Sequence, residues 1–62
     1  MEKRFLLISV VAKGATKPLF ERSVTLENST ELAEFPFSKV IDSLDVLWNK
    51  IPHVINFNLS EL

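Results

Sequence analysis

The 62-residue sequence contains no cysteine, one histidine and one glycine. The absence of cysteine excludes disulfides and thiol chemistry, and it is typical of a reducing compartment, so we expect a cytoplasmic protein. A single histidine without cysteine leaves no ligand set for a structural zinc ion. One glycine cannot form a glycine-rich phosphate-binding loop. We therefore expect neither a metal nor a cofactor.

The short length limits how much core the chain can build. It predicts a single domain spanning residues 1–62, and a domain of this size buries only about 60% of the surface of its unfolded chain. Because disulfides and metals are excluded, association with another subunit is the remaining common way to add buried surface. Self-association is thus the first functional expectation.

An apolar run from Phe5 to Ala12 follows the charged residues at the amino end. The run is much shorter than the roughly 20 apolar residues that cross a membrane, and no small-residue cleavage site of a signal peptide follows it. It instead predicts a β-strand over about residues 4–13, in which side chains alternate between two faces. One face carries Leu6, Ile8, Val10 and Ala12, and the other carries Phe5, Leu7 and Val11.

Three further segments complete the predicted fold. After a turn that contains the single glycine, alternation of apolar and polar residues predicts a second strand over about 19–27, and the same pattern predicts a third over about 53–60. Between them, apolar residues at three- and four-residue spacing predict a helix over about 36–50, preceded at 31–34 by a helical turn or a loop. The apolar stripe of this helix contains Phe37, Val40, Ile41, Leu44, Leu47 and Trp48.

These elements predict a small α+β fold of the order ββαβ. A right-handed crossover from the second strand to the third leaves a position between them, which suits the first strand because both of its faces are apolar. We expect a three-stranded antiparallel sheet in the order 2-1-3 with one helix packed on one face. The other face stays uncovered and exposes Phe5, Leu7 and Val11, which form the predicted dimer interface. Joining of two copies at an edge strand is the alternative.

No residue pattern indicates catalysis. His53 lies between a proline and the start of the third strand, without a serine or an acidic residue in the order of a known catalytic triad. Asp42 and Asp45 lie three residues apart on the predicted helix, but without histidine or further ligands a solvated pair is the simpler interpretation. We expect no catalytic residues and no enzyme activity.

Charge is distributed unevenly along the chain, although the formal net charge is only −1. The first two strands and their turn carry most of the basic side chains, Lys3, Arg4, Lys13, Lys17 and Arg22. A basic hairpin suggests nucleic-acid binding, but the net charge and a pI of about 5.7 argue against it. The helix and the segment before it are acidic, which is most simply a solvated face and alternatively fits a larger protein partner with a basic surface.

The order hairpin, helix, strand in a chain of this length is similar to that of small phage-encoded inhibitors of uracil-DNA glycosylase. The resemblance implies a dimer that occupies the DNA-binding surface of a host enzyme. It concerns the order of elements only and transfers no functional residue. The candidates for a partner contact of this kind are Glu31, Glu34, Asp42, Asp45 and Trp48.

Together these features predict a noncatalytic protein–protein interaction module that acts as a homodimer through its uncovered sheet face. An inhibitor of a host nucleic-acid enzyme is the first alternative function. A nucleic-acid-binding protein that uses the basic hairpin is the second. No association with a membrane is expected.

Overall fold

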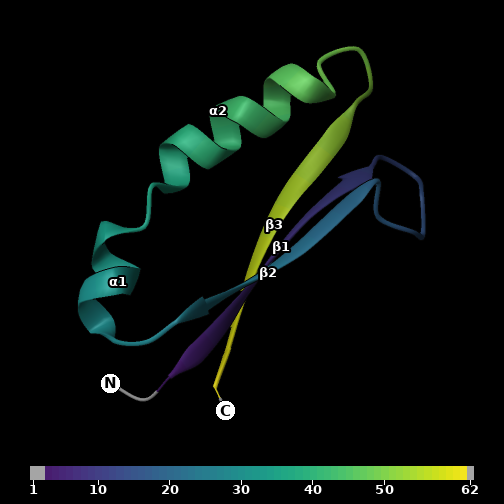
Figure 1. Ribbon diagram of the computed structural model, residues 1–62. Helices are drawn as coiled ribbons and strands as arrows, with labels where there is room; N and C mark the ends of the chain where they lie inside the picture. The colour runs from purple at the N-terminus through teal and green to yellow at the C-terminus, as the bar shows by residue number, and fades with distance from the viewer. Residues whose placement is uncertain (1–2, 62) are drawn as a thin grey trace.

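Three strands form one antiparallel sheet in the order β2-β1-β3, and two helices lie on the same side of it (Figure 1). The computed structural model describes residues 3–61. Its elements are β1 (Arg4–Ala12), β2 (Phe20–Leu26), α1 (Ser29–Glu34), α2 (Phe37–Leu47) and β3 (His53–Glu61). The α+β class and the strand order predicted from the sequence are confirmed.

The central strand β1 supplies most of the core. Its side chains alternate as predicted, so Leu6, Ile8 and Val10 point toward the helices and are only 2%, 4% and 0% exposed. Leu26 of β2 and Leu44 of α2 complete the buried cluster. Burial of each such side chain stabilises the fold by about 1.5–3 kcal/mol.

A loop over residues 13–19 joins β1 to β2, and it begins with a turn in which the Ala15 amide donates to the Ala12 carbonyl at 3.0 Å. Gly14 has a φ of +84°, a left-handed conformation that side chains with a Cβ rarely adopt, which explains why the single glycine stands here. The Leu19 amide then donates to the Val10 carbonyl at 2.7 Å, so pairing begins directly after Pro18. The turn predicted from glycine and proline is therefore present.

Helix α1 is the main difference from the predicted ββαβ order, in which only one helix packs on the sheet. Its six residues include no buried side chain, although Leu32 packs against the edge of the core. Capping holds its start: the Asn28 side chain accepts from the Glu31 amide at 2.9 Å, and the Glu31 carboxylate accepts from the Glu27 amide at 2.8 Å. The segment at 31–34, predicted as a helical turn or a loop, is thus part of a short capped helix.

Helix α2 lies diagonally across the sheet. Near its start, Phe37 packs on Phe57 of β3 with ring centroids 5.2 Å apart, and just after its end Trp48 packs on Phe20 of β2 at 5.7 Å. The helix ends at Leu47, three residues before the predicted end. Leu47 was expected in the core stripe, but its side chain is 68% exposed because Trp48 occupies the position against the sheet.

Two leucines of α2 provide a matched test of this packing. Leu44 is 6% exposed, and Leu44→Ala is expected to lower the free energy of unfolding by about 2–5 kcal/mol through lost burial and a residual cavity. Leu47→Ala should change it by less than about 0.5 kcal/mol. Urea denaturation followed by Trp48 fluorescence measures both. A Leu44→Ala chain that does not fold agrees with the expectation, whereas equal losses for the two variants would contradict it.

Candidate interaction surfaces

The sheet has one face without helices, which we call the open sheet face. The strand register brings its residues into rows, because residues opposite each other on neighbouring strands point to the same side. Leu7 lies between Ser23 and Asn58, and Ser9 lies between Glu21 and Asn56. The face comprises Phe5, Leu7, Ser9 and Val11 of β1, Glu21, Ser23 and Thr25 of β2, and Val54, Asn56, Asn58 and Ser60 of β3.

An apolar column runs along the middle of the open sheet face. Phe5, Leu7 and Val11 are half-buried by their neighbours on the flanking strands, and Val54 extends the column at one end with 47% exposure. Hydroxyl and carboxylate side chains border the column on β2, while amides border it on β3. Within residues 3–61 nothing covers this column. The structure thus brings the three predicted interface residues onto one face, and their role in a dimer stays a prediction.

A groove opens on the opposite side of the sheet, between α2 and β2. It lies where α2, which starts over β3 and reaches β2 at Phe20, leaves Arg22 and Val24 in the middle of β2 uncovered. Its volume is about 380 Å³. The groove is lined by Ile8, Phe20, Arg22, Val24, Phe35, Lys39, Val40, Ser43 and Leu44. Sequence reasoning missed it, although Arg22 within the apolar alternation of β2 was a signal.

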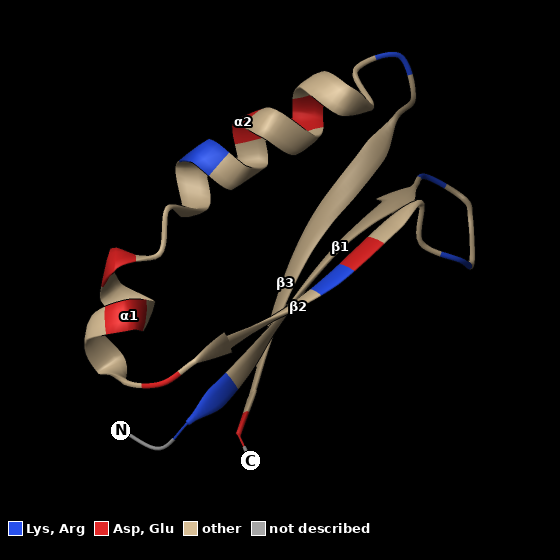
Figure 2. Ribbon diagram, viewed as in Figure 1, with Lys and Arg blue, Asp and Glu red and all other residues tan. Residues whose placement is uncertain are grey.

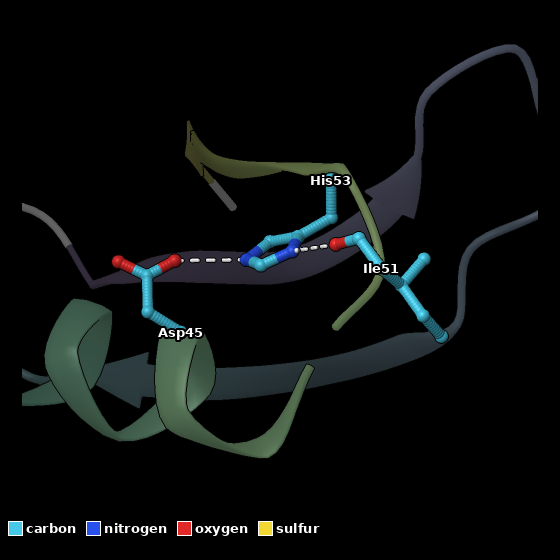
Figure 3. Close-up of polar contacts among 3 residues, drawn as sticks. All are labelled: Asp45, Ile51 and His53. Atoms are coloured by element: carbon cyan, nitrogen blue, oxygen red, sulfur yellow. Dashed lines mark hydrogen bonds and ion pairs between the residues drawn. The ribbon is translucent and has the colours of Figure 1, made fainter. Parts of the chain in front are cut away.

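The single histidine connects the end of α2 to the start of β3 (Figure 3). His53 Nδ1 donates to the Ile51 carbonyl at 2.6 Å, and Nε2 donates to Asp45 Oδ1 at 2.8 Å. The side chain of His53 is only 11% exposed. The Ile51 carbonyl, and after it the Asp45 carboxylate, raise the pKa of His53, because an imidazolium can donate to both acceptors at once. The two bonds connect the end of α2 and the segment after it to the start of β3.

The acidic partner-binding candidates are dispersed, and several contact their own chain. Asp45 binds His53, the Glu31 carboxylate accepts from the Glu27 amide before α1, and Trp48 is half-buried against Phe20. Figure 2 shows the acidic positions spread along both helices. Among the described residues, no group of three or more His, Cys, Asp or Glu side chains is arranged to hold a metal ion.

The basic residues of the hairpin are also divided between different places. Lys3 and Arg4 form ion pairs with Glu27 and Glu61, at 3.6 Å and 2.9 Å. The lysines of the turn lie at the far end of the sheet, as Figure 2 shows, whereas Arg22 lines the groove. The hairpin therefore does not present one continuous basic surface.

The chain matches no protein-family model, and it shows no significant similarity to a curated protein or to a solved structure. In the part of the chain that the structure describes, every helix is too short or too polar to cross a membrane.

The raised pKa of His53 predicts how stability depends on pH. The protonated side chain stabilises the fold fully below its usual pKa near 6.5, and this contribution is lost as the pH rises through the higher pKa of the folded state. We expect the urea midpoint of the wild type to fall across that interval above 6.5. His53→Gln should remove this dependence.

Asp45→Asn is the matched control for the cause of the shift. It should lower the pKa of His53 only in part, since the bond to the Ile51 carbonyl is the larger cause and remains. Because the sequence has one histidine, a proton NMR titration reports this pKa directly. A pKa at or below 6.5 in the wild type would contradict the expectation.

Proposed function

We propose that the chain is a noncatalytic protein–protein interaction module that self-associates through the open sheet face. The observation that carries this proposal is the apolar column of Phe5, Leu7 and Val11 in the middle of a face that no described element covers. An apolar centre with a polar rim is the usual anatomy of a protein interface.

The extended shape of a single chain supports a second copy as the occupant. The radius of gyration is 12.7 Å, whereas a compact domain of this length has about 11 Å. The buried hydrophobic side chains within residues 3–61 are Leu6, Ile8, Val10, Leu26 and Leu44. A core of this size leaves a short chain close to the limit of stability. Burial of the apolar column against a second copy would add the buried apolar surface that one chain lacks.

The polar borders of the open sheet face favour one geometry for the two copies. A two-fold axis parallel to β1 would set the β2 border of one copy against the β3 border of the other. Glu21 would then meet the partner's Asn56, and Ser23 would meet the partner's Asn58, because each pair lies in one row of the register. Amides can donate to both the carboxylate and the hydroxyl. An axis across the strands would instead bring the two β2 borders, with their Glu21 carboxylates, onto the same side.

The inhibitor and nucleic-acid alternatives draw less support from these surfaces. The side chains of Glu31, Asp45 and Trp48 contact their own chain, which leaves Glu34 and Asp42 as the acidic candidates without such a contact among the described residues. The basic side chains are split between ion pairs, a turn and the groove. We therefore propose self-association ahead of both.

A lysine within the apolar column should abolish self-association. Leu7→Lys is expected to yield a monomer, because pairing two sheet faces would bury two unpaired ammonium groups. Light scattering and sedimentation equilibrium measure the mass. Val54→Lys provides a second variant with less risk to the fold, since Val54 is already 47% exposed. A stable dimer of Val54→Lys with the wild-type dissociation constant would contradict the proposed interface.

Controls separate this interface from general effects of charge. Ser38→Lys adds the same charge on the exposed side of α2 and should leave the mass unchanged. Glu34→Gln combined with Asp42→Asn should also leave self-association unchanged, whereas a contact through the acidic surface would weaken and show strong salt dependence. A wild-type monomer at high protein concentration would refute self-association itself.

A further inference from the structure

The groove between α2 and β2 combines an apolar floor with positively charged side chains. Ile8, Phe20 and Val24 contribute apolar side chains, and Ile8 is only 4% exposed. The charged side chains that line the groove within the described residues are Arg22 and Lys39, and both are cationic. The ion pairs found within residues 3–61 involve other side chains. The groove is therefore complementary to an occupant with an anionic group and apolar flanks.

The groove lies beside a free strand edge. β2 is an outer strand of the sheet, so along its seven residues the backbone groups that point away from β1 have no strand partner. Phe20, Arg22 and Val24 project into the groove at alternate positions of this strand. A free edge next to a lined groove is the arrangement by which extended peptides add a strand to a sheet, with backbone bonds for affinity and alternate pockets for specificity.

Helix α2 forms the second wall of the groove. Val40, Ser43 and Leu44 line it from α2. Leu47 lies one turn beyond Ser43 on the same side of the helix and is 68% exposed. Part of the apolar stripe of α2 is thus left uncovered by the sheet, next to the residues that line the groove.

The charge of the groove argues against a second copy as its occupant. Antiparallel pairing of two β2 edges would join the two grooves and bring two Arg22 and two Lys39 side chains together. The groove-lining positions of β2 supply no carboxylate to compensate them. A charged residue on the inward face of an edge strand is a known device against pairing of identical edges. Arg22 disfavours a copy of this chain and favours a strand that carries an acid.

We propose that β2 binds an extended segment of another protein with the pattern apolar-x-acidic-x-apolar. The acidic side chain lies at the level of Arg22 and Lys39, and the apolar side chains cover Phe20 and Val24. A volume of about 380 Å³ is sufficient for three such side chains at the lower end of known binding pockets. This site goes beyond the proposed self-association, and it uses the opposite side of the sheet, so both contacts can exist at the same time.

A blocked heptapeptide, Thr-Val-Thr-Glu-Thr-Val-Thr, is the probe. It is titrated to millimolar concentration into the full-length, isotopically labelled protein, with backbone amide shifts as the readout. We expect saturable shifts along Phe20–Leu26, and about tenfold weaker binding when glutamine replaces the central glutamate. A lysine at that position should weaken binding further.

Variants at Arg22 make the test specific. Arg22→Glu is expected to reverse the preference, so that the lysine peptide binds more tightly than the glutamate peptide. If Arg22→Glu does not fold, Arg22→Gln serves instead and should lower affinity for the glutamate peptide about tenfold without changing affinity for the glutamine peptide. Lys39→Gln should produce a smaller change in the same direction.

Several results would overturn the proposal. One is the absence of saturable shifts, and another is equal affinity for the glutamate and glutamine peptides. Shifts centred on Leu7 and Asn58 would assign the peptide to the open sheet face. Changes in the β2 amides on dilution of the protein alone would assign this edge to a second copy. None of these results depends on the mass measurements that test self-association, so the two proposals fail separately.

Discussion

The two apolar faces of β1 are the constraint on which the rest of the structure depends. Such a strand is stable only in the middle of a sheet, where neighbours cover its backbone on both edges. One face packs against the helices through Leu6, Ile8 and Val10, and the other creates the apolar column of the open sheet face. Because a chain of this length has helices for one face only, the position of β1 decides both where the core forms and where an uncovered apolar surface remains.

The two surfaces differ in the chemistry that they present. The open sheet face has an apolar centre with neutral and acidic borders, and its rows are self-complementary. The groove has an apolar floor with Arg22 and Lys39, and this positive charge is complementary to the anionic segment that we propose for it. The surface suited to a second copy of the chain therefore lies on one side of the sheet, and the surface that disfavours a second copy lies on the other. In the assembly that we propose, a second copy and an acidic segment occupy opposite sides of the sheet and do not compete.

The sequence predicted the features that depend on local alternation and on general rules of topology. The strand order followed from the apolar faces of β1, and the start of α2 followed from Pro36 and the spacing of Phe37, Val40 and Leu44. Helix α1 was not fixed in advance because its stability comes from capping by Asn28, and the same residues also favour turns. The groove was missed because periodicity reveals the width of an apolar stripe without revealing how much sheet lies beneath it. Likewise, the bond between Asp45 and His53 depends on how the chain turns after Leu47.

The pairing of β1 with β3 has a consequence for the kinetics of folding. Arg4 bonds Glu61 across a separation of 57 residues, whereas β1 and β2 are joined by a short turn. The hairpin can form early at small entropic cost, but β1 keeps one unpaired edge until α1 and α2 have brought β3 back beside it. During that interval a strand that is apolar on both faces is exposed to other chains. Formation of the helices thus controls how long the hairpin remains prone to aggregation.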